Sequence, residues 1–301
     1  MPAFDHVAII FNPKSTGDAP ANAENLAADL KLVLPDVPVE LLPTERAGHA
    51  QELAYDFAHK YQRPLIISAS GDGGYNEAIN GALRAQKEGA TPICAVLPSG
   101  NANDHARTMH TRPLHELIRA GAVTDIDILQ VTIRPPDSEE VVARYAHSYV
   151  GLGLTPKVGL ELNRHKLNPL VEAWIVFWTL LRFDPVAVDI GGARRRLDSL
   201  VCGNVPGMAK VLSLSGAANP RDGLFELTVI AHRHRFSLFI RLLKGVVNEI
   251  GAARQLKQYT FTLPDASLLQ CDGEIMHAAA GSTVEVTACP RLLRTIAEPL
   301  Q

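Results

Sequence analysis

The segment 65–86 constrains the fold of this chain more than any other. It runs from a short apolar stretch, Leu65–Ser70, through a glycine-rich turn, Gly71–Gly74, into a helical pattern from about Asn76 to Gln86. A buried strand that turns through glycines directly into a helix is typical of a parallel α/β sheet, whose strands are joined by crossover helices.

The same alternation extends over the first ~125 residues. Apolar runs at 7–11, 39–42 and 93–97 predict further strands, and the patterns at 22–34 and 47–61 predict helices. A second turn, Pro98–Asn101, leads into another helix at about Asn103. We therefore expect an N-terminal α/β domain with a parallel sheet.

The pattern changes after Thr124. Strand-like runs are then separated by turns instead of regular crossover helices, which indicates a largely antiparallel, β-rich second domain over 126–289. The expected strands are 126–133, 141–149, 197–202, 208–214, 224–230, 259–263 and 283–288, and the expected helices are 167–183 and 238–250. A chain of 301 residues is long enough for two domains.

The glycine turn suggests a site for phosphate. Glycines allow the backbone to approach a phosphate closely, and the helix N-terminus offers N–H groups and a favourable dipole. The turn is not a Walker A motif, because no Gly-Lys-Ser/Thr follows, and Asn76 stands where a dinucleotide fingerprint has its third glycine. Taken alone, it could be an ordinary tight turn.

Four segments, read together, resemble the diacylglycerol kinase catalytic family, which is related to the sphingosine kinases. Residues 12–17 resemble its N-P-x-S-G opening and 44–50 match its T-x-x-x-G-H-A segment; 70–80 resemble G-G-D-G-T-x-N-E-x-x-N and 98–107 resemble P-x-G-T-x-N-D-F-A-R. The segments occur in the family's order. Further matches at 151–153, 219–224 and 271–274 extend the resemblance over most of the chain.

The resemblance implies an α/β nucleotide-binding domain over 1–125, joined by the C-terminal tail 290–301, and a lipid-binding domain over 126–289. It implies ATP and Mg²⁺ as cofactors and a lipid alcohol as the acceptor. Catalytic roles fall on Asp72, Asp272 and Glu274, with Asp272 as the general base facing Asp72 across a cleft. The implied nucleotide-binding residues are Asn12, Ser15, Thr44, Ser70, Gly71, Gly73, Gly74, Asn76, Glu77, Gly100, Asn101 and Asn103.

The loop 219–224 resembles one that holds a structural Mg²⁺ in bacterial relatives. The ligands implied are the Asp222 carboxylate and the backbone carbonyls of Asn219 and Leu224, and hard oxygen ligands suit Mg²⁺. Arg221 replaces a residue that is often acidic in the family.

Departures from the family pattern leave alternatives open. Gly74 and Asn101 replace threonines, so two hydroxyl donors are missing, and Ser70 replaces the first glycine of the loop. We expect a threonine restored at position 74 to hold or raise activity if it still fits. A structural explanation also exists for the aspartates, since Asp72 could cap a helix and Asp272 could occupy a hairpin turn.

Composition limits the classes of partner and the cellular location that we expect. A net charge of −3 gives no electrostatic reason to expect nucleic acid. The four cysteines lack the spacing of a zinc site or disulfide framework, and no signal peptide is recognisable, so a cytoplasmic location is expected. Basic runs at 194–196 and 232–235 could contact the inner membrane peripherally, or could be solvated loops.

The apolar segment 167–183 has three interpretations: a buried helix, a wall of an acyl-chain slot, or a face on the membrane surface. The leading hypothesis for the whole chain is an ATP-dependent lipid kinase. A catalytically silent nucleotide- or lipid-binding protein and an NAD kinase are the alternatives. The sequence identifies neither the acceptor lipid nor the oligomeric state.

Overall fold

The computed structural model describes residues 4–15, 17–163, 171, 174–175, 178–179, 182–208, 212–213, 218–232 and 253–298. The chain divides into two compact units, 1–126 with 291–301, and 127–290. The strands β5 (Val123–Arg134) and β17 (Thr283–Ile296) each contribute residues to both units.

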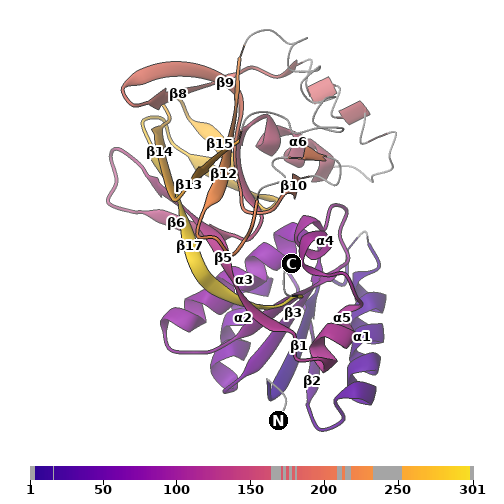
Figure 1. Ribbon diagram of the computed structural model, residues 1–301. Coiled ribbons are helices and arrows are strands. Elements are labelled where there is room, and N and C mark those ends of the chain that lie inside the picture. The colour runs from indigo at the N-terminus through magenta and orange to yellow at the C-terminus, as the bar shows by residue number, and fades with distance from the viewer. Residues whose placement is uncertain are drawn as a thin grey trace. The chain divides into compact units, whose positions relative to one another are not determined.

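The first unit is a parallel sheet with helices on both faces (Figure 1). Its strands lie in the order β4-β3-β1-β2, and β1 pairs in parallel with both β2 and β3. The elements are β1 His6–Phe11, α1 Ala19–Val33, β2 Val39–Pro43, α2 His49–Lys60, β3 Pro64–Ser70, α3 Asp72–Lys87, β4 Ile93–Pro98, α4 Asp104–Met109 and α5 Leu114–Arg119.

Strands β1, β3 and β4 are buried on both faces, because they are apolar along nearly their whole length, whereas the edge strand β2 is partly exposed. Val7, Ile9 and Ile67 pack with the apolar sides of α1 and α5 in one core cluster. On α3, Gly81 allows α2 to approach at backbone distance, since a Cβ there would lie 2.0 Å from the carbonyl oxygen of Gln51.

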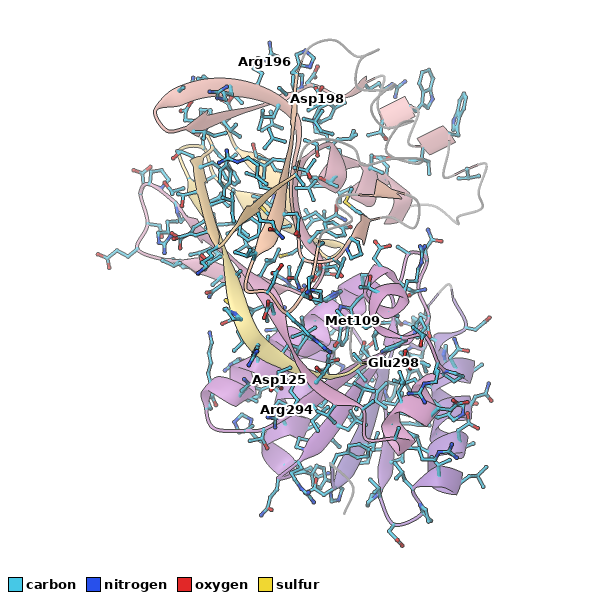
Figure 2. All side chains as sticks on the ribbon, in the orientation of Figure 1. Met109, Asp125, Arg196, Asp198, Arg294 and Glu298 are labelled. Atoms are coloured by element: carbon cyan, nitrogen blue, oxygen red, sulfur yellow. The ribbon has the colours of Figure 1, made fainter. Side chains whose placement is uncertain are left out.

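The C-terminal tail belongs to the first unit. Thr295 pairs in parallel with Cys94 of β4 and donates its hydroxyl to the Cys94 carbonyl at 2.9 Å. The tail makes two further contacts, through residues that Figure 2 labels. The Arg294 guanidinium lies 3.1 Å from the Asp125 carboxylate, and the Glu298 N–H donates to the Met109 carbonyl at 3.2 Å.

The second unit is built mainly from antiparallel strands. They follow the order β16-β15-β7-β9-β8-β14-β17, with β12 also paired to β9 and β13, and β5 paired to β6. The elements are β6 Val142–Ala146, β7 Tyr149–Gly153, α6 Leu154–Asn163, β8 Val186–Ile190, β9 Ala193–Gly203, β10 Gly207–Met208, β11 Leu212–Ser213, β12 Phe225–Ala231, β13 Arg254–Leu256, β14 Gln258–Thr262, β15 Ser267–Cys271 and β16 Glu274–Ala278.

These observations confirm the predicted fold class, a parallel α/β unit followed by a largely antiparallel β-rich unit. The expected strand 141–149 is instead two strands, β6 and β7, separated at His147 and Ser148. The helix expected at 238–250 and residues 233–235 of the second basic run lie outside the described residues. Within the part of the chain that is described, no helix has the length and apolarity needed to cross a membrane.

Candidate functional site

Loops from the first unit gather at one edge of its parallel sheet. The segments 12–17, 70–74 and 98–103 follow the carboxyl ends of β1, β3 and β4, and Thr44 follows β2. Thr44 donates its N–H to the Phe11 carbonyl at 2.8 Å, which ties the ends of β2 and β1. Ligands of open α/β sheets bind at the carboxyl ends of the strands.

The two glycine loops touch through their backbones. A Cβ at Gly100 would lie 2.2 Å from the Gly71 Cα, and a Cβ at Gly71 would lie 3.1 Å from the Gly100 Cα. The Ser99 N–H also donates to the Ser70 carbonyl at 3.0 Å. Glycine is therefore needed at 100 for a steric reason that involves no ligand.

Asp72 joins the same two loops by its carboxylate. Its oxygens accept the N–H groups of Asp104 at 3.2 Å and His105 at 3.3 Å, at the N-terminus of α4. The side chain thus caps a helix, but the helix is α4 and not its own, α3. Asp72 has a structural role at the centre of the loops, beside any role toward a ligand.

Helix α3 begins earlier than the sequence indicated. Gly71 is its N-cap, so Asp72, Gly73 and Gly74 form the first turn instead of a loop that precedes the helix. The first N–H groups of a helix have no partner within it, and here they belong to this glycine-rich turn. A helix start of this kind is suited to an anion.

Ser70 fills the space next to Gly74. A Cβ at Gly74 would lie 2.7 Å from both Cβ and Oγ of Ser70. The Ser70 hydroxyl lies 2.7 Å from the Ser68 hydroxyl and donates to the Gly71 carbonyl at 3.0 Å. A threonine at 74 does not fit while Ser70 is present, so the condition under which we expected activity to hold or rise is not met in the wild-type loop.

Asn103 supports the second loop from inside. Its amide nitrogen donates to the Gly100 carbonyl at 2.8 Å, and its Oδ1 accepts the Gly100 N–H at 3.0 Å. The residue has φ of 52°, in the left-handed region that asparagine tolerates better than most residues. Asn101 is exposed on the same loop.

The first loop is shaped by Asn12 and Ser15. Asn12 Oδ1 accepts the Lys14 N–H at 2.9 Å, and Ser15 Oγ accepts the Gly17 N–H at 3.3 Å. A Cβ at Gly17 would lie 2.4 Å from the Ser99 carbonyl oxygen, so this loop also contacts the second glycine loop. Lys14 is exposed and was not among the predicted site residues, although a cation in a phosphate-binding loop is a chemical signal that could have selected it.

Asn76 and Glu77 support the loops from within the protein. Asn76 is fully buried, and the Asn80 amide donates to its backbone carbonyl at 2.8 Å and to its Oδ1 at 3.2 Å. Glu77 accepts the Gly48 N–H at 3.0 Å and so links α3 to the start of α2. Asn76 is therefore buried behind the loop, whereas Glu77 is partly exposed and connects two helices.

In the second unit, Asp272 occupies the two-residue hairpin between β15 and β16. Asp272 has φ of 49° and Gly273 has φ of 104°, and positive φ at both positions characterises a type I′ turn. The Asp272 side chain is fully buried. Its oxygens accept the N–H groups of His147 at 2.6 Å, Ser148 at 2.9 Å and Tyr149 at 2.8 Å.

The His147 ring completes this cluster. Its Nε2 lies 3.3 Å from Asp272 Oδ2, and its Nδ1 lies 2.8 Å from the Ser148 hydroxyl. All three residues are fully buried. Three N–H donors bound to one carboxylate explain why the chain leaves the β6–β7 strand pattern at His147 and Ser148.

Other groups beside this hairpin differ in exposure. Glu274 is partly exposed, and its carboxylate lies 4.0 Å from the Arg144 guanidinium. Burial raises the pKa of the Cys271 thiol well above its ordinary value, and the Asp272 charge adds to the rise. Cys271 is therefore a neutral core residue, whereas Glu274 is within reach of solvent.

The loop 219–224 makes polar contacts both within itself and with neighbouring residues. The Asn219 carbonyl accepts the N–H groups of Arg221 at 2.7 Å and Asp222 at 3.4 Å. Asp222 accepts the Leu224 N–H at 2.9 Å and lies 3.5 Å from the Gln255 amide nitrogen. Within the described ranges there is no group of three or more His, Cys, Asp or Glu residues arranged for a metal ion.

Two further carboxylates lie near this loop: Asp127, whose Oδ2 accepts the Gly223 N–H at 2.6 Å, and Glu226. Glu226 is buried and its Oε1 accepts from Gln255 at 3.2 Å, while among the residues that the structure describes its Oε2 has no hydrogen-bond partner. Burial raises the pKa of Glu226, and the Asp222 charge adds to the rise. Within 219–224 itself, the oxygen donors for Mg²⁺ are the partly engaged Asp222 carboxylate and backbone carbonyls, and an ion held by them would keep several waters.

Comparison with known proteins gives one consistent result. The diacylglycerol kinase catalytic domain family matches residues 6–131. Over 111 residues the chain is 32% identical to a diacylglycerol kinase of Staphylococcus haemolyticus, covering 34% of this chain and 29% of that protein. Over 97 residues it is 31% identical to sphingoid long-chain bases kinase 1 of Arabidopsis thaliana, covering 32% of this chain and 13% of that protein.

A crystal structure of a putative diacylglycerol kinase from Bacillus anthracis has the same fold. It matches with a TM-score of 0.74 at 20% identity, and the match covers 99% of each chain. The sequence matches span less than a third of the two relatives' lengths, whereas the fold extends over the whole chain.

Proposed function

Because residues 6–131 belong to the diacylglycerol kinase catalytic domain family, we propose that this chain transfers the γ-phosphoryl group of ATP to a hydroxyl of diacylglycerol, a sphingoid base or a related lipid. The observation that supports this proposal most is the meeting of three loops at one edge of the parallel sheet, with Gly71 and Gly100 in backbone contact. Phosphoryl transfer needs positioned donors around the phosphates and little covalent chemistry from the protein.

The first unit offers groups of the kind that bind a nucleoside triphosphate with Mg²⁺. The first turn of α3 offers backbone N–H groups, Lys14 offers a positive charge, and Ser70 and Asn101 offer polar side chains. Mg²⁺ is commonly held by one or two carboxylates together with phosphate oxygens and waters, and Asp72 supplies one carboxylate. When bound, the ion neutralises charge on the transferred phosphoryl group.

Asp272 is proposed as the base that accepts the proton of the lipid hydroxyl, on the strength of the family pattern Asp-Gly-Glu. Three backbone N–H donors and the adjacent His147 ring hold the carboxylate in one orientation, which an acid–base group requires. Glu274, which is partly exposed, is proposed to assist on the acceptor side. The chain would then act from the cytoplasm on lipid of the inner membrane.

The alternative of a catalytically silent binding protein rests on the threonine hydroxyls that are missing at Gly74 and Asn101. Ser70 weakens this alternative, because its hydroxyl lies beside the space that a side chain at 74 would fill. The Ser70 hydroxyl therefore lies near the place where the family's threonine at position 74 would carry its own.

The test is ADP release by the purified chain with Mg·ATP and detergent-dispersed diacylglycerol, sphingosine or no lipid. We expect lipid-dependent release, and Asp272→Asn should lower turnover while ATP affinity stays within a fewfold of wild type. Asp265→Asn, at an exposed loop position of the same unit, is the matched control. Lipid-independent release, or equal loss in both variants, would contradict the proposal.

A further inference from the structure

The segment after α6 exposes an aromatic helix face. Trp174 is 57% exposed and Trp178 is 41% exposed, and both lie in helical turns of the second unit. Arg182 is also helical and exposed. The spacing of 174, 178 and 182 places the three side chains on one side of a helix.

Two described apolar residues next to these positions are buried instead. Ile175 is 8% exposed, and Phe183, just beyond the helical turns, packs in a core cluster with Tyr149, Leu154 and Val201. The segment is therefore anchored to its own unit by apolar side chains. The tryptophans are left outward, which is unusual because large aromatic side chains normally supply core area.

The exposed residues form one connected group. The Trp174 and Trp178 ring centroids are 5.5 Å apart, and the Arg182 guanidinium carbon lies 4.9 Å from the Trp178 centroid. A guanidinium on an aromatic face keeps its charge and can still donate N–H groups to a phosphate.

We infer that Trp174, Trp178 and Arg182 form a docking face for the surface of an anionic phospholipid bilayer. Tryptophan favours the interface between headgroups and acyl chains, where its ring is in apolar surroundings and its N–H is in polar ones. Arginine adds attraction to lipid phosphates. Arg182 gives the described part of this face a positive charge, which complements an anionic surface.

The inference rests on the proposed function, since an enzyme whose acceptor is a membrane lipid must reach the bilayer. It also decides among the three interpretations of 167–183. The described tryptophans are too exposed for a simple buried helix, and the face is suited to a flat apolar surface with charged headgroups.

The chain provides its own probe, because Trp174 and Trp178 are its two tryptophans. The full chain is titrated with phosphatidylcholine vesicles, with or without phosphatidylglycerol. We expect a blue shift of tryptophan emission and quenching by brominated lipid, both stronger with phosphatidylglycerol. In the single variants Trp174→Phe and Trp178→Phe, the remaining tryptophan should respond in the same way.

Vesicle flotation measures the binding itself. The double variant Trp174→Ala, Trp178→Ala should bind about tenfold or more weakly, and Arg182→Ala should lose the preference for phosphatidylglycerol. Leu32→Ala, which removes an apolar side chain that is 82% exposed on α1, is the matched control and should bind as wild type.

Three results would overturn the inference: no flotation of wild type, flotation without change in tryptophan emission, or a blue shift that follows protein concentration without vesicles. The last result would assign the face to a second copy of the chain. These readouts need no turnover, so a failure of the proposed kinase activity, measured with detergent-dispersed lipid, remains distinguishable.

Discussion

The pair Ser70 and Gly74 allows a sharp test of how the glycine turn is built. In Gly74→Thr the new Cβ would lie 2.7 Å from Ser70 Cβ, and no rotation of Ser70 moves its own Cβ away. Overpacking of this kind costs about 1–3 kcal/mol. Replacing a helical glycine returns roughly 0.5 kcal/mol, so we expect a net loss of about 1–2 kcal/mol in the free energy of unfolding.

The second substitution should relieve the first. Ser70→Gly alone loses the hydroxyl contacts with Ser68 and the Gly71 carbonyl and should cost about 1 kcal/mol. In the double variant, apart from the local backbone of α3, the nearest remaining atom to a Cβ at 74 is Ser68 Oγ, at an ordinary 4.0 Å. A threonine side chain at position 74 then fits, and the double variant should be more stable than the sum of the single changes predicts.

Calorimetric melting of the four proteins measures this coupling. Gly74→Thr should melt about 2–8 °C below wild type, and the double variant should recover most of the loss together with ADP release. A coupling of at least about 1 kcal/mol is expected, whereas independent sites add within about 0.5 kcal/mol. Additive losses would refute the reasoning that Ser70 occupies the space of a side chain at 74.

The remaining predictions concern single side chains. Asp72→Asn should lower turnover about a hundredfold or more and melting stability by about 1 kcal/mol, since asparagine offers one acceptor where the N–H groups of Asp104 and His105 bind; turnover within a fewfold of wild type would contradict this. Asp222→Ala should abolish the difference in melting temperature between Mg²⁺ and EDTA, and an unchanged difference would exclude a metal role. Burial lowers the pKa of His110, whose Nε2 lies 3.1 Å from the Ile296 carbonyl. Its stabilising contribution is therefore complete above the ordinary value of 6.5 and is lost as pH falls through the lowered pKa, so His110→Gln should flatten the pH dependence of melting there.

The sequence was sufficient to predict the fold because its signals are local. The apolar run ending at Ser70 and the turn after it predict β3 and α3, and the loss of helical spacing after Thr124 predicts the antiparallel unit. Strands β8, β13, β15 and β16 were missed, because they are short and partly exposed and carry no continuous apolar run.

The site was harder to predict because its contacts join distant residues. Nothing near Asp72 in the chain indicates that its carboxylate caps α4, 32 residues later. Likewise, the Asp-Gly pair predicts a hairpin at Asp272, but only the fold brings its carboxylate to the backbone of His147 and Ser148. In the sequence, Ser70 and Gly74 are two separate departures from the family pattern. The distance between them shows that they are coupled, because the Ser70 side chain occupies the space of a side chain at 74.

Transfer of phosphoryl to lipid is the central claim, and radiolabelled ATP tests it most directly. The purified chain is incubated with γ-labelled ATP, Mg²⁺ and a total lipid extract, and the extracted lipids are separated. We predict label in a lipid phosphate, dependent on Mg²⁺ and lost in Asp72→Asn. Label found in inorganic phosphate alone, or no release of label from ATP, would contradict the account.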